Sequence, residues 1–346
     1  MENVLKETKN MFTCVGTVYE KKLELTNIEI EAGPRDNKKK VKTDCIKGSV
    51  VIKIPSGTVT FPVYGTKIGY NGKDNFKWNM FSAMRDEWVP KVGGKGEEPT
   101  RVIITGNFNI NDYVGRDGNV SSDLQYRINT ANTRVTEDMT DGFNIKFTGF
   151  INKMMPEIKN EEETGRLKVE FLCVDYNGKC YPVNCIAEAE SVELLTEGDS
   201  DFEPFAPGQT RRDIEAEYTV VSATPTVTVE PTKTRSFRKN NGPKVEAPKS
   251  RDQHELILYS ATEAAVEKPE ELTYTNDDGE EAPVETDWIN PKTMKEAIKI
   301  RNEMLEEKKN NPPADKKSNP ANNLAAMKAK AKSMPSWTGD DDDDIF

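Results

Sequence analysis

Hydrophobic and polar residues alternate with a period of two over most of the first 135 residues, and turn-forming residues separate the runs. Alternation of this kind is typical of β-strands that bury one face. It predicts five strands, at residues 12–25, 45–54, 58–66, 101–110 and 124–135. Between the third and fourth strands, residues 75–89 have helical spacing instead. The apolar stripe of that helix comprises Phe76, Met80, Met84 and Trp88.

An OB-fold barrel has five strands, and the predicted order of five strands with one helix after the third matches it. A second β-rich stretch follows, with strands predicted at residues 143–154, 166–176, 179–189 and 213–221. Asn177 and Gly178 form a favoured two-residue hairpin turn between two of these strands. The acidic residues 157–165 are interpreted as a surface loop. We therefore predict a mainly β protein with a five-stranded OB-fold barrel followed by a second small OB-like barrel.

From residue 222 the pattern changes to a sequence rich in Thr, Pro and Lys, which is typical of a linker. Residues 254–264 form one more β-like run. Asn290 can cap a helix and Pro291 suits its first turn, ahead of an apolar stripe that reaches Leu305. The predicted segments are an OB-fold domain at 1–138, a second OB-like domain at 139–222, a linker at 223–290, an amphipathic helix at 291–309 and a disordered tail at 310–346.

The composition agrees with a chain that is only partly compact. Hydrophobic residues make up 35% of the 346 residues, and the mean hydropathy is -0.73. No run approaches eighteen apolar residues, and the N-terminus lacks the apolar core of a signal peptide. We expect a cytoplasmic protein.

The net charge of -11 is unevenly distributed. Residues 1–135 contain 21 Lys and Arg against 16 Asp and Glu, a surplus of five positive charges. The rest of the chain contains 27 basic and 43 acidic residues. The distribution of charge decides which partners a surface attracts, so the basic N-terminal segment is compatible with nucleic-acid binding.

The cysteine and histidine content argues against metal and cofactor sites. The chain has five cysteines, an odd number without a Cys-x-x-Cys pair, which indicates reduced thiols. A zinc site at Cys173, Cys180 and Cys185 would need a fourth ligand, and the spacing fits no zinc-finger pattern. His254 is the single histidine, which disfavours Ser-His-Asp and Cys-His mechanisms. We expect no cofactor and no metal.

Three carboxylates, on Asp112, Asp117 and Asp123, raise the alternative of a metal-dependent nuclease or a calcium loop. An EF-hand alignment fails because it places Tyr113 where a carboxylate is required. Asp117 with Gly118 is already explained as a turn. No phosphate-binding glycine loop or nucleophile elbow is present. We expect no enzymatic activity, with a nuclease as the remaining alternative.

Residues 101–135 combine aromatic rings, arginines and amides on two neighbouring strands. Single-stranded nucleic acids are held in this way, because every base can stack on a ring and phosphates prefer a basic groove. Alternation places Tyr126 on the same face as Leu124 and Ile128, with Arg127 on the opposite face. If the Leu and Ile face is the interior, Tyr126 belongs to the core and Arg127 contacts the nucleic acid.

The segment after the third strand carries further aromatic and basic residues, of which Tyr70 and Trp78 are the preferred base platforms. The predicted single-strand site comprises Lys67, Tyr70, Lys73, Trp78, Arg101, Phe108, Tyr113, Arg116, Arg127 and Arg134.

The chain ends in a run of aspartates followed by two hydrophobic residues. These residues are Asp340, Asp341, Asp342, Asp343, Asp344, Ile345 and Phe346. A protein pocket with a basic rim can bind such a tip through the aspartates, the Phe346 ring and the terminal carboxylate. We predict a partner-binding tip.

The OB-like front with its "GNFNINDYVGRDG" and "QYR" stretches, the polar linker and the terminal "DDDDDIF" resemble bacterial and phage single-stranded DNA-binding proteins. Tails of that family end in aspartates, an Ile or Leu, a Pro and a Phe; the proline is absent here. The resemblance implies a protein that coats and protects single-stranded DNA. Through its tip it would recruit replication, recombination and repair proteins, in the bacterial cytoplasm or a phage-infected cell. The additional barrel and helix resemble a phage or mobile-element form.

Two other functions stay open from the sequence. Stacking and phosphate contacts do not distinguish DNA from RNA, so an RNA-binding or RNA-chaperone protein is one alternative. A scaffold whose barrels bind only protein is the other. Whether the chain forms a homo-oligomer is also left open.

Overall fold

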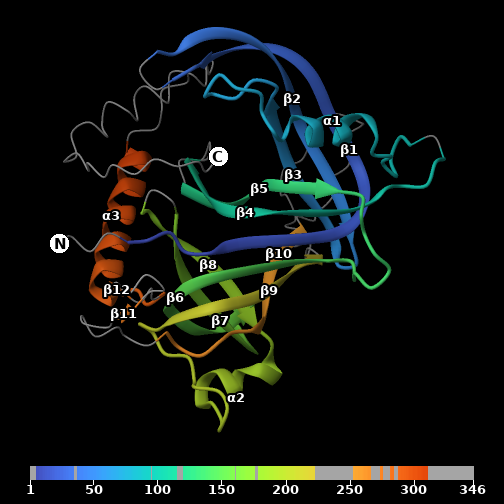
Figure 1. Cartoon of the computed structure of the whole chain (residues 1–346). Coiled ribbons are helices and arrows are strands. Elements are labelled where there is room, and N and C mark those ends of the chain that lie inside the picture. Colours follow the sequence, from blue (N-terminus) through green and yellow to red (C-terminus); the bar gives the residue numbers. More distant parts are fainter. Residues whose placement is uncertain are drawn as a thin grey trace, which may run out of the picture. The chain divides into compact units, whose positions relative to one another are not determined.

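The computed structural model describes residues 5–34, 37–94, 96–114, 120–159, 161–175, 178–222, 252–265, 273–275, 281–283 and 287–310. β-Strands dominate these residues, which confirms the mainly β class (Figure 1). The elements are β1 (Asn10–Ala32), β2 (Lys39–Ile54), β3 (Gly57–Thr66), α1 (Trp78–Asp86), β4 (Arg101–Val114), β5 (Val120–Asn132), β6 (Gly142–Lys159), β7 (Glu162–Val174), β8 (Cys180–Ala187), α2 (Ala189–Glu197), β9 (Thr210–Ser222), β10 (Asp252–Ser260), β11 (Thr273–Thr275), β12 (Glu281–Pro283) and α3 (Pro291–Asn310).

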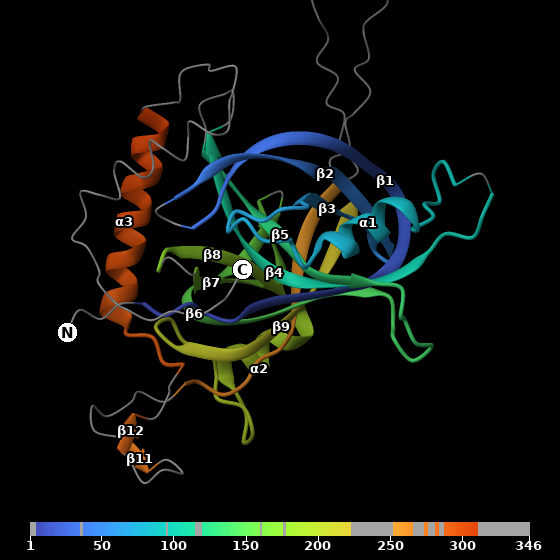
Figure 2. The same cartoon turned by 45° about the horizontal axis from the view of Figure 1, so that its top comes forward.

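The first five strands lie where the alternation predicted them, and β1 is their centre. β2 pairs with β1 and β3, while β4 pairs with β1 and β5. Among the described residues β3 and β5 each have one partner strand, so both are edges of this group. α1 contacts β1, β2 and β3 (Figure 2). The Phe81 ring packs against Gly65 of β3, where a Cβ atom would lie 2.2 Å from the ring.

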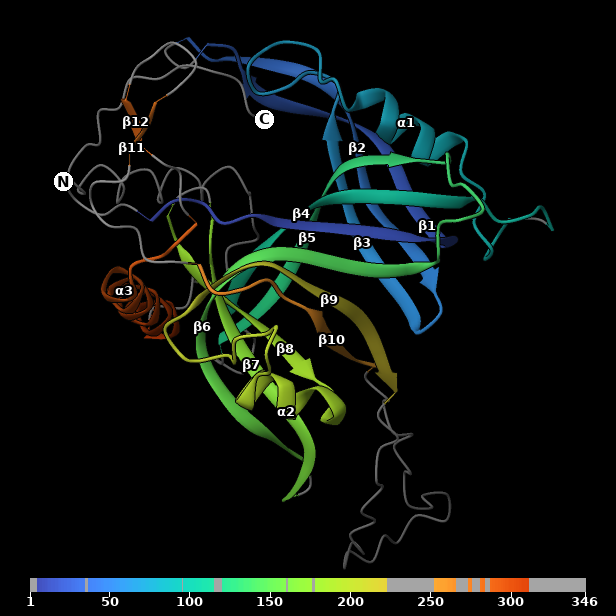
Figure 3. The same ribbon diagram turned by 60° about the horizontal axis from the view of Figure 1, so that its bottom comes forward.

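The later strands form a closed circuit of pairings (Figure 3). β6 pairs with β7, β7 with β8, β8 with β10, β10 with β9, and β9 returns to β6. All these pairs are antiparallel except β8 with β10, which is parallel. The four strands predicted for this stretch are confirmed, and the β-like run after the linker closes the circuit as β10.

One element of this region was not predicted, and one expectation is wrong. α2, at Ala189–Glu197 directly after β8, was not predicted from the sequence. The expected acidic loop is wrong, because residues 157–159 and 162–165 belong to the paired strands β6 and β7, with Lys159 opposite Glu162.

The two predicted barrels are joined in the structure. β1 pairs with β6 from Asn10 to Val15, and ten strands thereby form one sheet. The chain divides into a larger compact unit, residues 1–111 and 122–301, and a smaller one, residues 112–121 and 302–346. The domain boundaries given above remain a prediction.

Aromatic rings from both groups of strands meet in one core. Phe12 of β1 packs on Phe61 of β3 with ring centroids 5.5 Å apart. Tyr126 of β5 lies 4.8 Å from Phe143 of β6, and Phe143 lies 4.9 Å from Tyr218 of β9. Burial raises the pKa of Tyr126, so this hydroxyl stays protonated. The structure therefore confirms that Tyr126 packs into the core.

α3 closely matches the predicted helix. Its first turn is capped by Asn290, whose side-chain oxygen accepts the Lys292 N–H at 2.9 Å. Met294 is fully buried in a second hydrophobic cluster with Ile289 and residues of β6, β7 and β8. In the smaller unit, Lys308 Nζ donates to the Asp112 carbonyl at 3.3 Å.

The five cysteines are buried and unpaired. In the part of the chain that the structure describes, no group of His, Cys, Asp and Glu side chains is arranged to hold a metal ion. Of the helices described, none has the length and hydrophobicity needed to cross a membrane.

Arg211 of β9 is a fully buried cation that holds the loops around the second group of strands together. Its guanidinium donates to the carbonyls of Thr262 at 3.2 Å, Glu203 at 2.9 Å and Pro204 at 2.8 Å. It also lies 4.9 Å from the centre of the Phe205 ring. Burial lowers the pKa of Arg211. Removing this side chain would take away the donor of three part-buried carbonyls and leave the space of a fully buried side chain empty.

We expect Arg211→Ala to lower the free energy of unfolding by about 3 kcal/mol, because hydrogen bonds from a charged group are worth roughly 1.5–3 kcal/mol each and the three acceptors here can recover part of that from water. Urea denaturation followed by circular dichroism measures this loss. The neighbouring Arg212 is the matched control, since its half-exposed side chain is 3.8 Å from Asp287. Arg212→Ala should cost under about 1 kcal/mol. Equal losses for the two variants would contradict the role of Arg211.

Candidate nucleic-acid interface

The outer face of β3 is polar and carries one exposed ring. Val59, Phe61 and Val63 point into the core, and the alternate residues point outward. Tyr64 is the last outward residue, with 55% of its surface exposed. It lies directly opposite Lys47 of β2, which is also exposed. Cross-strand partners share one face of a sheet, so a ring and a cation lie side by side here.

The segment after β3 folds back onto the β1–β2 hairpin. The Lys67 N–H donates to the Asp44 carbonyl at 2.9 Å, and the Gly33 N–H donates to the Tyr70 carbonyl at 3.0 Å. The Ile68 N–H donates to Thr43 Oγ1 at 3.0 Å. These bonds fix the position of Tyr70 on the same outer surface as Tyr64.

Tyr64 and Tyr70 lie close to one another. The Tyr70 and Cys45 side chains are near enough to the Tyr64 hydroxyl to influence its pKa. Partial burial, reinforced by these two neighbours, raises the pKa of Tyr64, so the phenol is neutral and does not repel phosphate. Tyr70 is 60% exposed, which leaves the rings accessible to a ligand.

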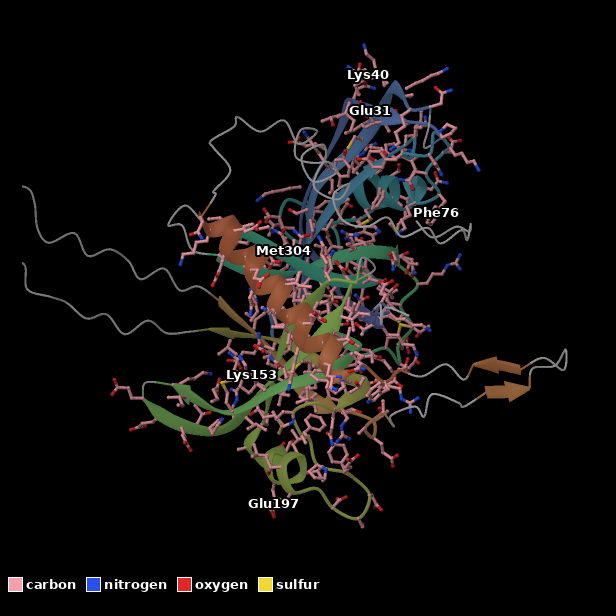
Figure 4. The ribbon with its side chains drawn as sticks, turned by 90° about the vertical axis from the view of Figure 1, so that its left-hand side faces the viewer. Glu31, Lys40, Phe76, Lys153, Glu197 and Met304 are labelled. Atoms are coloured by element: carbon pink, nitrogen blue, oxygen red, sulfur yellow. The ribbon has the colours of Figure 1, made fainter. Side chains whose placement is uncertain are left out.

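A third ring precedes α1. Phe76 is 74% exposed, and Figure 4 labels this side chain. Lys77 Nζ lies 5.7 Å from its ring centroid. Lys77 is itself held by the Ile128 carbonyl at 3.2 Å and by Asn129 Oδ1 at 3.1 Å. Burial lowers the pKa of Lys77.

Placing Phe76 on the core stripe of a helix was wrong, because α1 begins only at Trp78. Trp78 is instead partly buried against the core. The exposed ring at this point of the chain is therefore Phe76. We call Lys47, Tyr64, Lys67, Tyr70, Lys73 and Phe76 the ring-lysine surface.

Lys67 and Lys73 are exposed, as is Tyr70, and lie with it in one loop. The more distal lysines of the β1–β2 hairpin are partly neutralised, since Lys40 Nζ is 3.2 Å from Glu29. Figure 4 labels Lys40 at that hairpin. The ring-lysine surface thus combines exposed rings and cations from β2, from β3 and from the segment between β3 and α1.

Residues from β4 and β5 have mixed positions. Phe108 is 1% exposed and packs edge-on against Phe147. Its prediction as a base platform is wrong, because it lies on the side of β4 that alternation buries. Arg101 is bound to Asp141 at 2.8 Å and to the Met139 carbonyl, which fastens the start of β4 to the loop after β5. Arg127 is exposed on the outer face of β5, as the alternation predicted.

The remaining predicted residues lie elsewhere. Arg134 is exposed just beyond the end of β5. Tyr113 is 44% exposed but belongs to the smaller unit. Arg116 and the tip residues 340–346 lie outside the described residues.

Tyr64, Phe76 and Lys47 were missing from the predicted site. Tyr64 could have been identified from the sequence. The alternation of β3 places it on the solvent-facing side of the strand, together with Thr58, Thr60 and Pro62.

Known proteins relate to this chain at the level of sequence family and of structure. A search of curated proteins finds no match. A mutant form of the single-stranded DNA-binding protein from Thermus aquaticus is similar in structure, with a TM-score of 0.37 and 11% sequence identity. The similarity covers 77% of this chain and 99% of that one, and is too low to support any conclusion about function. A sequence profile matches residues 9–311, and the chain therefore belongs to the YorF family.

Proposed function

We propose that this chain is a non-enzymatic, sequence-independent single-stranded DNA-binding protein. It would coat and protect exposed strands during replication, recombination and repair, and its C-terminal tip would recruit partner proteins. The observation that carries the proposal is the ring-lysine surface. There Tyr64 and Tyr70 are exposed with Lys47, Lys67 and Lys73, and Phe76 is exposed three residues after Lys73.

The connectivity of the strands supports two OB-fold barrels. In the first group α1 lies between the third and fourth strands, and in the second group α2 does. An OB-fold binds oligonucleotides on the face of its second and third strands and with the loops beside it. Lys47 of β2 and Tyr64 of β3 lie on that face. The loop after β3, which carries the other four residues, is hydrogen-bonded to the β1–β2 hairpin beside it.

The chemistry of the surface suits a flexible polyanion with flat bases. Each base that stacks on an aromatic side chain contributes about 1–3 kcal/mol, whatever its identity. Lysines attract phosphates without reading sequence. Because neither interaction depends on the order of bases, binding should be sequence-independent.

The first test is a titration of labelled oligo-dT, oligo-U and duplex DNA at two salt concentrations. We expect tight binding of oligo-dT that weakens as salt rises, because bound lysines release counterions from the strand. Fluorescence anisotropy measures the dissociation constants. Preference for oligo-U would instead favour the RNA-binding alternative. If the protein binds neither oligonucleotide, the protein-binding scaffold is the function that remains.

The second test removes two rings. The double variant Tyr64→Ala with Tyr70→Ala should bind oligo-dT about 30-fold or more weakly, since two stacks of roughly 1–3 kcal/mol each are lost. Its thermal midpoint should stay near that of the wild type, because both side chains are largely exposed.

Tyr259→Ala is the matched control for this variant. Tyr259 of β10 is 55% exposed, the same fraction as Tyr64, and lies outside the ring-lysine surface. Its removal should leave the affinity unchanged. If the double variant binds as well as the Tyr259 variant, the ring-lysine surface is not the binding site.

The third test concerns the tip. Deleting residues 337–346 should strengthen oligo-dT binding at low salt by about threefold or more, because a tethered polyanion competes with DNA for the lysines. The difference should shrink at high salt. Phe346→Ala keeps every aspartate and serves as the control, with unchanged DNA affinity. Unaltered low-salt affinity of the deletion variant would rule out the competition while leaving recruitment of partners open.

A further inference from the structure

A groove of about 530 Å³ separates β3 from β5. These two strands are the edges of the first group, since among the described residues β3 pairs only with β2 and β5 only with β4. Its walls are formed by Thr58 and Thr60 of β3 and by Gln125 and Tyr126 of β5. Tyr218 of β9 and His254 of β10 complete the lining.

Pro62 gives a reason why the two edges do not pair. Proline has no N–H, so within a paired strand it is tolerated where its nitrogen points away from the neighbouring strand. Pro62 pairs with Ser49 of β2, and its nitrogen therefore faces the groove. The groove edge of β3 lacks a donor at this residue, which disfavours the addition of β5 or of any other strand.

One end of the groove is a stack of two rings. His254 lies parallel to Tyr218, with centroids 5.1 Å apart and planes at 22°. Tyr218 is nearly buried against the aromatic core, whereas His254 is exposed. The core thus fixes one ring of the stack and leaves the other accessible from the groove.

The groove is continuous with the ring-lysine surface. Thr58, Thr60 and Pro62 occupy the same outer face of β3 as Tyr64. Lys53 of β2 is exposed directly opposite Thr58. A positively charged side chain therefore lies beside β3 where this strand borders the groove. A strand that stacks on Tyr64 and follows β3 would place its next nucleotides over the groove.

We propose that this groove holds a base of the bound single strand, stacked on His254 and bordered by the hydroxyls of Thr58 and Thr60 and the amide of Gln125. The inference rests on the proposed DNA-binding function and extends it to a second contact. The volume is within the range of small-molecule pockets, about 300–1,000 Å³. A nucleobase fits the polar and aromatic lining, whereas a peptide strand would meet the edge that Pro62 interrupts.

The single histidine makes this inference directly testable. Diethylpyrocarbonate modifies accessible histidines and can be followed by mass spectrometry. Saturating long oligo-dT should protect His254 from modification at least about tenfold, since a stacked base covers the ring. Duplex DNA at the same concentration should not protect it. Equal modification rates with and without bound oligo-dT would overturn the proposal.

Two variants of His254 distinguish the loss of a stacked base from a loss of local structure. His254→Ala should weaken binding of long oligo-dT by about tenfold, the effect of losing one stack, while His254→Phe should retain it. A short oligonucleotide that spans only the ring-lysine surface should bind both variants equally. If His254→Ala binds long oligo-dT like the wild type while the Tyr64 and Tyr70 variant does not, the groove proposal fails and the DNA-binding proposal stands. If the wild type binds no oligo-dT, the DNA-binding proposal itself fails.

Discussion

The rest of the fold depends on the pairing of β1 with three other strands. The first half of β1 is hydrogen-bonded to β4 on one side and to β6 on the other, and its second half continues as a long hairpin with β2. Phe12, at the point where β4 and β6 both flank β1, contacts the rings of Phe61, Tyr126 and Phe143. One strand therefore contributes to two groups of strands, and the rings around Phe12 make their cores continuous. Separating the groups would expose this aromatic cluster, at a cost of about 1.5–3 kcal/mol for each large side chain.

This shared core determines which aromatic residues are available to a ligand. The inward-facing side chains of each strand pack in the core, although Phe108 and Tyr126 lie in the stretch richest in rings and arginines. Phe108 is therefore unavailable to a ligand, and Tyr126 offers only the part of its side chain that lines the groove. The outward parity of β3, and the loop that bonds to the β1–β2 hairpin, carry Tyr64 and Tyr70 instead. A binding surface on this molecule is consequently built from residues that the core cannot use. The same logic applies at the groove, where Tyr218 belongs to the core and His254 does not.

Alternation in the sequence was sufficient to place the strands of the sheet, because each buries one face and exposes the other. It was not sufficient for α2, whose short sequence follows β8 without a turn signal, and it did not show which strands pair. The circuit through β10 depends on a parallel contact between strands about 70 residues apart, which leaves no local pattern. For the candidate site, Lys67, Tyr70 and Lys73 were found because a turn flanked by lysines is visible in the sequence. Phe76 was misassigned because helical spacing started the helix at residue 75, three residues before its true start at Trp78.

The acidic net charge is compatible with DNA binding because salt screens charges that lie far from the binding surface. At physiological salt, charges separated by more than roughly 8 Å are largely screened. A phosphate bound at the ring-lysine surface would therefore respond mainly to charges within that distance, such as those of Lys47, Lys67 and Lys73. The proposed competition by the acidic tip would be an exception, because a segment tethered to the same chain has a high effective concentration near the lysines. The position of negative charge along the chain, more than its total, decides whether it opposes DNA.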